Sequence, residues 1–103
     1  MAKFAIKADP TFTAKVGFPV AGGATVDVLV TFRHRTAEEL DKWLLDRRGM
    51  SDVDSFMSMV IGWELDEAFN AENVKILLQH RIGVAMATFM TYIDELTKSR
   101  SKN

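Results

Sequence analysis

The chain has 103 residues, no cysteine and a formal net charge of −1 at pH 7. Its 48% apolar and 26% charged content is ordinary for a folded protein, and its length suits a single domain spanning residues 1–103. The lack of cysteine excludes a disulfide framework and a thiolate zinc site. A nearly balanced charge and no apolar run of about 20 residues predict no nucleic-acid and no membrane partner.

The first part of the chain alternates polar and apolar residues, which predicts strands. Phe4 and Ile6 share one face of a short segment that ends at Pro10, because proline lacks a backbone donor. This beginning lacks the long apolar region of a signal peptide, so we expect a cytoplasmic protein. In the next strand Gly17 and Pro19 favour an edge position or a bulge. Its apolar residues recur at every second position: Phe12, Ala14, Val16 and Phe18.

A turn at residues 21–24 separates this strand from the next one, in which the alternation is clean apart from Leu29. Such a strand packs one face on a core and leaves the other face to water. A lone hairpin is marginally stable, so we expect helices to cover it. The apolar face of the strand carries Val26, Val28, Val30 and Phe32.

Three helix starts follow, each marked by a capping residue. Thr36 and Glu39 have the spacing of a capping box, and Gly49 is expected to end that helix. Ser51 caps a second helix, and Asn70 caps a third. The apolar stripe of the second helix is predicted to run through Val53, Phe56, Met57, Val60 and Ile61.

Residues 60–64 are interpreted as the apolar end of that helix followed by a Gly-Trp-Glu corner. Phe69 and Val74 flank Asn70 with the spacing of a hydrophobic staple, which predicts a rigid helix-to-helix connection. A last helix is expected from Gly83 to Lys98. Its stripe consists of Ala85, Met86, Phe89, Met90, Ile93 and Leu96.

Strands followed by helices indicate an α+β fold. We expect an N-terminal antiparallel β-hairpin or small sheet packed on a C-terminal set of about four α-helices. Residues 99–103 are polar and are predicted to form a frayed tail.

The sequence offers no catalytic constellation. It has two histidines, His34 and His80, and no glycine-rich phosphate loop before a helix. Both histidines are interpreted as structural. The acidic residues near Glu64 and Asp52 lack the spacing of a calcium loop, so no metal and no cofactor is predicted. We therefore expect no enzyme.

Methionines and two aromatic residues are the candidates for a partner surface. Methionine adapts to irregular partners, although at helical spacing it more often packs in a core. Met59 and Tyr92 fall off the main stripes of their helices, which makes them better candidates than Phe56 or Phe89. Trp63 is equally compatible with a core and an interface. The hypothetical partner face comprises Met59, Trp63, Met86, Met90 and Tyr92.

Several stretches resemble the small tail assembly chaperones of long-tailed bacteriophages. The resemblance runs from about Phe18 to the C-terminus and follows apolar positions and junctions. The stretches that carry it are Val60-Ile61-Gly62-Trp63-Glu64, Phe69-Asn70-Ala71-Glu72-Asn73-Val74, the strand end from Val30 to Thr36, and Tyr92…Leu96-Thr97…Lys102-Asn103.

The resemblance implies an assembly factor of a phage or prophage, located in the cytoplasm of the host bacterium. Such a protein holds the tape measure protein soluble, helps to recruit tail tube subunits and is absent from the finished particle. Homo-oligomer formation is left open. The alternative is a structural tail-completion or head-tail connector protein that stays in the particle, and a small nucleic-acid-binding regulator ranks third.

Overall fold

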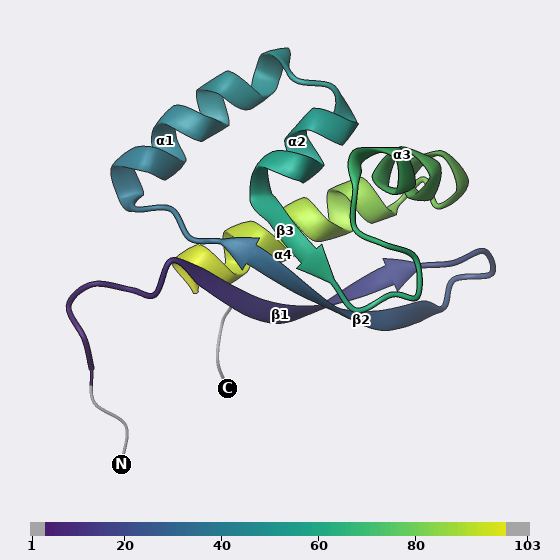
Figure 1. Cartoon of the computed structure of the whole chain (residues 1–103), viewed down its shortest axis with the longest axis horizontal. Helices are drawn as coiled ribbons and strands as arrows, with labels where there is room; N and C mark the ends of the chain where they lie inside the picture. Colours follow the sequence, from purple (N-terminus) through teal and green to yellow (C-terminus); the bar gives the residue numbers. More distant parts are fainter. Residues whose placement is uncertain (1–3, 99–103) are drawn as a thin grey trace.

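The computed structural model describes residues 4–98 and combines a three-stranded sheet with four α-helices (Figure 1). This arrangement confirms the predicted α+β fold. The predicted tail at residues 99–103 lies outside the described residues. In chain order the elements are β1 (Thr11–Pro19), β2 (Thr25–Arg33), α1 (Ala37–Asp46), the short 3₁₀ helix η1 (Arg47–Gly49), α2 (Asp52–Met59), β3 (Val60–Trp63), α3 (Ala71–His80) and α4 (Val84–Thr97).

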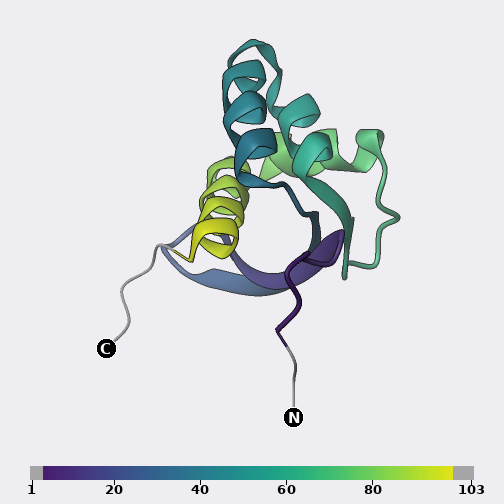
Figure 2. The ribbon, with the colours of Figure 1, turned by 90° about the vertical axis from the view of Figure 1, so that its left-hand side faces the viewer.

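The strands are antiparallel in the order β1-β2-β3, so β2 is central and β1 lies at an edge, as its glycine and proline predicted. The hairpin turns through Gly22 and Gly23, whose positive φ angles of 96° and 91° favour glycine. Figure 2 shows the strands curving beneath the helices. The buried side chains of β2, Val28, Val30 and Phe32, face the helices.

The expected short strand around Phe4 and Ile6 is absent from the described residues. Residues 4–10 have no regular secondary structure, and both apolar side chains are 96% exposed. The alternation there is real, but no neighbouring strand is in place to pair with it. Alternation alone does not form a strand, because a strand is stabilised by its cross-strand partners.

The expected helix end at Val60 and Ile61 is also wrong, because Val60–Trp63 is the third strand of the sheet. Val60 pairs with Phe32 and Trp63 with Val30, and the register shifts between these pairs. Val60 and Trp63 are an odd number of positions apart, so in a regular strand they would face opposite sides. The extra residue of the β-bulge lets both side chains face the core.

The helix caps follow the sequence prediction. The Thr36 side chain accepts a hydrogen bond from the Glu39 amide and Glu39 accepts one from the Thr36 amide, which completes the capping box. The Ser51 hydroxyl accepts from the Asp54 amide, and Asn70 accepts from the Asn73 amide. Each cap satisfies a backbone donor that the first helical turn leaves free.

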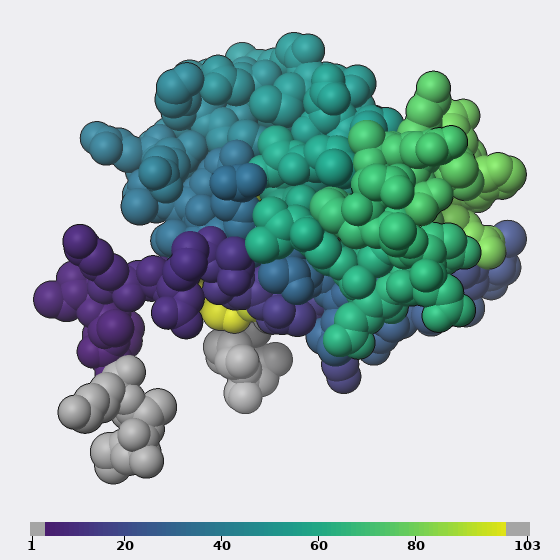
Figure 3. All heavy atoms as spheres, viewed as in Figure 1, coloured from purple at the N-terminus to yellow at the C-terminus, as the bar shows by residue number. Residues whose placement is uncertain are grey.

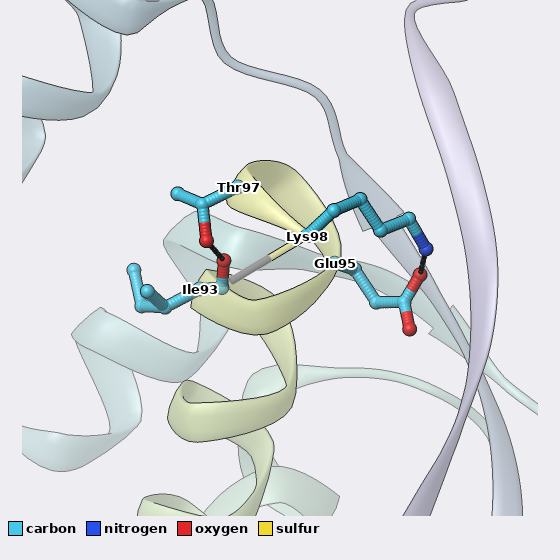
Figure 4. A network of polar contacts seen from close by, with 4 residues as sticks. All are labelled: Ile93, Glu95, Thr97 and Lys98. Carbon is cyan, nitrogen blue, oxygen red and sulfur yellow. Dashed lines mark hydrogen bonds and ion pairs between the residues drawn. The ribbon is translucent and has the colours of Figure 1, made fainter. Parts of the chain in front are cut away.

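The last helix closes the core along the edge strand. α4 packs on β1, and its start is held so tightly that a Cβ on Gly83 would lie 2.8 Å from Pro19 Cγ. Only glycine fits there without a shift of the hairpin. At the other end the helix stops at Lys98, whose backbone is left-handed. Figure 4 shows this end, where the Thr97 hydroxyl donates to the Ile93 carbonyl and Lys98 pairs with Glu95.

Candidate partner-binding surface

Tyr92, proposed from the sequence as a partner residue, lies at the centre of the core. Its ring stacks on Phe32 with centroids 5.2 Å apart and on Phe12 at 6.1 Å. The edge of Trp43 meets it at 5.4 Å. Tyr92 has no exposed surface, so the expectation that it lies outside the core is wrong.

The Tyr92 hydroxyl can be buried because it forms two hydrogen bonds. It donates to the Arg33 carbonyl at 2.7 Å and accepts from Arg35 Nη1 at 2.9 Å. Burial raises the pKa of Tyr92, and this effect outweighs the opposing hydrogen bond from Arg35. The Arg35 guanidinium also lies over the Trp43 ring at 4.8 Å. Tyr92 therefore ties α4 to the junction between β2 and α1.

Met59 is likewise a core residue, 1% exposed, so the expectation that it lies off the inward stripe of its helix is also wrong. The reason is the early end of α2. Because the chain enters the sheet at Val60, the inward face of α2 consists of Ser55, Phe56 and Met59. A helix continuing to Ile61 would have had its stripe elsewhere.

Trp63 is half-buried at the end of β3 and forms one wall of a small pocket. Its ring edges meet Phe69 at 5.1 Å and Phe56 at 6.3 Å, and its Nε1 donates to the Glu67 carbonyl at 2.8 Å. The pocket holds about 200 Å³, enough for a single side chain. It is lined by Trp63, Leu65, Glu67, Asn73, Ile76, Leu77, His80 and Arg81.

Met86 and Met90 are exposed, at 59% and 53% of their residue surface. They lie one turn apart on α4, and Ile82, in the turn that precedes this helix, is 86% exposed. We call Ile82, Met86 and Met90 the methionine stripe. α4 carries apolar residues on nearly all sides, which is the pattern of a helix that is buried on every face. Large apolar side chains gathered on one exposed face are typical of protein interfaces.

The structure thus separates the five candidate residues into three environments. Met86 and Met90 lie together on α4, whereas Trp63 joins residues of α3 in its pocket. Ile76 and Ile82 are exposed apolar residues that the sequence analysis missed. Ile82 could have been found from its position between two helices, because it belongs to the apolar stripe of neither helix. Partner contact at Trp63, Met86 and Met90 stays a prediction.

Two arginines that would otherwise be free to bind a nucleic acid are engaged within the fold. The Arg47 guanidinium lies 3.7 Å from the Phe89 ring centroid, and its Nε donates to Ser55. Arg35 is held by Tyr92 and Trp43. A groove of about 620 Å³ near Arg33 also carries acidic groups. Its charged lining mixes Arg33, Arg35 and Lys42 with Glu39 and Asp46.

Within residues 4–98, no three histidine, cysteine, aspartate or glutamate side chains gather where they could hold a metal ion. None of the helices in that range has the length and apolar content needed to cross a bilayer.

One family model, described as phage tail assembly chaperone, matches residues 1–103, the whole length of the chain. Among curated proteins and solved structures, none matches. A chaperone family indicates a non-catalytic role and interaction with other tail proteins.

Proposed function

The chain belongs to the phage tail assembly chaperones, and we propose that it binds the tape measure protein in the cytoplasm of the host bacterium. In this role it keeps the long client soluble, helps to recruit tail tube subunits around it and leaves before the particle is complete. The role requires binding surfaces and no catalysis.

The methionine stripe is the observation that carries this proposal. A long helical client with apolar positions aggregates unless a partner covers those positions. An amphipathic helix can lay its apolar face along exposed apolar side chains of a second helix. Met86 and Met90 are each more than half exposed. Their flexible side chains can adapt to differently shaped segments of such a client.

The test is co-expression of the chain with the tape measure protein of the same genome. We expect the client to stay soluble and to co-purify only when the chain is present. The soluble fraction and the recovered complex are measured by affinity capture of the tagged client. An aggregated client in the presence of folded chain would argue against the proposal.

The variant Met86→Lys/Met90→Lys tests the surface. Each lysine would place a charge where an apolar partner packs, so we expect the affinity for the client to fall about tenfold or more, or at least 1.4 kcal/mol. Leu45→Lys on α1 is the matched control, because Leu45 is also exposed, at 63%, and lies outside the stripe. Equal binding by both variants would remove the stripe from the interface and leave the chaperone role standing.

A further inference from the structure

The segment before β1 carries two large apolar side chains without any cover. We call residues 4–10 the leading segment. Phe4 and Ile6 are each 96% exposed, more than any other large apolar residue described. Figure 3 shows the segment standing away from the body of the protein. Its apolar residues alternate with Ala5 and Lys7, the pattern of a strand that pairs along one edge and packs one face.

The edge strand β1 offers a complementary row of backbone groups. The His34 amide donates to the Pro10 carbonyl at 2.9 Å, and the Val20 amide donates to the Ala24 carbonyl at 3.0 Å. In an antiparallel pair of strands, hydrogen-bonded and non-hydrogen-bonded residue pairs alternate. These two bonds therefore show that the even-numbered residues of β1 form the backbone hydrogen bonds to β2. The odd-numbered residues Thr11, Thr13, Lys15 and Gly17 therefore direct their backbone groups outward. Within residues 4–98, no strand pairs with that outer edge.

The apolar face of β1 is incompletely covered at its beginning. Val16 and Phe18 are buried beneath the helices, whereas Phe12 and Ala14 are only half-buried. An added strand at the outer edge would lie directly beside Phe12 and Ala14. Its apolar side chains would extend the core at the point where the helices leave it open.

We propose that the leading segment of a second copy of this chain adds as a strand to the outer edge of β1. The phases agree, because even-numbered residues carry the apolar side chains in both segments. Phe4 and Ile6 would then pack beside Phe12 and Ala14, while odd-numbered residues of both strands exchange backbone hydrogen bonds. Two copies can each supply one segment and one edge, which closes a twofold-symmetric dimer.

A second copy fits this edge better than the same chain does. The residue before Pro10 is held in an extended conformation, because the proline ring disfavours a helical turn there. The leading segment accordingly leaves β1 and runs away from the sheet (Figure 1). Exchange of such a segment between protomers needs no change in the rest of the fold.

The first experiment measures the oligomeric state of the full chain by sedimentation. We expect a dimer that becomes a monomer in Thr13→Pro, since this change removes an outward amide and leaves the bonds to β2 intact. Phe4→Asp/Ile6→Asp should have the same effect without altering the sheet. Leu45→Asp, at an exposed site on α1, should remain dimeric. Circular dichroism verifies that each variant is folded.

The second experiment uses the absence of cysteine from the chain. Chains with Ile6→Cys and one tag are mixed with chains carrying another tag and either Phe12→Cys or Ala14→Cys. We expect disulfide-linked heterodimers with at least one of these partners and none with Leu45→Cys.

Three outcomes would overturn the proposal. The wild-type chain could sediment as a monomer, the heterodimers could fail to form, or a doubly substituted Ile6→Cys/Ala14→Cys chain could close its disulfide within a single copy at high dilution. The last result would assign the edge to the chain's own leading segment. None of these outcomes bears on client binding, which the co-expression experiment measures separately.

Discussion

At the scale of single residues, the hydroxyl of Tyr92 is a buried polar group with two hydrogen-bond partners in place. It is fully buried, and it satisfies both the Arg33 carbonyl and the Arg35 guanidinium. A buried polar group is costly when it lacks a partner and modestly stabilising when paired. The position is therefore specific for tyrosine.

We expect Tyr92→Phe to lower the free energy of unfolding by about 1–3 kcal/mol. The ring stack with Phe12 and Phe32 would persist, but the Arg33 carbonyl would lose its donor. Urea denaturation followed by circular dichroism measures the change. A loss well below this range would mean that water replaces the hydroxyl without penalty.

Because the pKa of Tyr92 is raised in the folded protein, we expect the free energy of unfolding to depend on pH in the alkaline range. In the unfolded chain the phenol ionises near its ordinary pKa of 10.0, whereas burial keeps it protonated in the folded protein. Its contribution is thus fully present below pH 10.0 and is lost as the pH rises through the higher pKa of the folded protein. Because Tyr92 is the single tyrosine, its tyrosinate absorbance reports this titration directly. Tyr92→Phe should remove this component.

Capping residues could be predicted from the sequence, whereas the buried positions of Met59 and Tyr92 could not. Thr36, Ser51 and Asn70 act on amides three residues away, so local spacing determines their role. The burial of Tyr92 instead depends on β1, β2 and α1 meeting α4. No pattern within one helix contains that information.

At the scale of elements, β3 shows how a short strand was mistaken for a helix end. Val60 and Ile61 continue the apolar spacing of α2, and four residues are too few for a period to identify a strand. The pairing with β2 determines the outcome. The sheet needs a third strand because a two-stranded ribbon is only marginally stable.

Because of the bulge, we expect the adjacent apolar residues Val60 and Ile61 to differ in how well they tolerate a charged substitution. Val60 is 1% exposed and Ile61 is 41% exposed. We expect Val60→Lys to cost several kcal/mol through a buried charge, whereas Ile61→Lys should change stability by no more than about 0.5 kcal/mol. Thermal melting of both variants measures the difference. Equal losses would show that the register differs from the one described.

At the scale of the whole molecule, α4 has two faces with different roles. Val84, Thr88 and Tyr92 face the core, while Met86 and Met90 point outward. The spacing of apolar residues predicted this helix, but the predicted stripe included Met86 and Met90, which are exposed, and missed the buried Val84, Thr88 and Tyr92. The pattern could not separate the two faces, because apolar residues occupy both. The Trp63 pocket was not predicted, because it forms between β3 and α3. The sequence pattern had indicated a helix-to-helix connection at this place, without a strand.

An assembly factor that acts before the particle is complete should be missing from purified virions. We expect mass spectrometry of purified particles to detect the tape measure and tail tube proteins without this chain, and lysates of infected cells to contain it. A stoichiometric amount in the particles would favour the tail-completion or head-tail connector alternative.

The place of Tyr92 within the core has a consequence for the order of synthesis. The rings of Phe12 and Phe32 leave the ribosome early, and the residue that stacks on both of them follows about 60 residues after Phe32. Until α4 emerges, the nascent sheet keeps an uncovered aromatic face, and contacts of such long sequence separation form late. We therefore expect the chain to be prone to aggregation during translation, until its last helix covers this face.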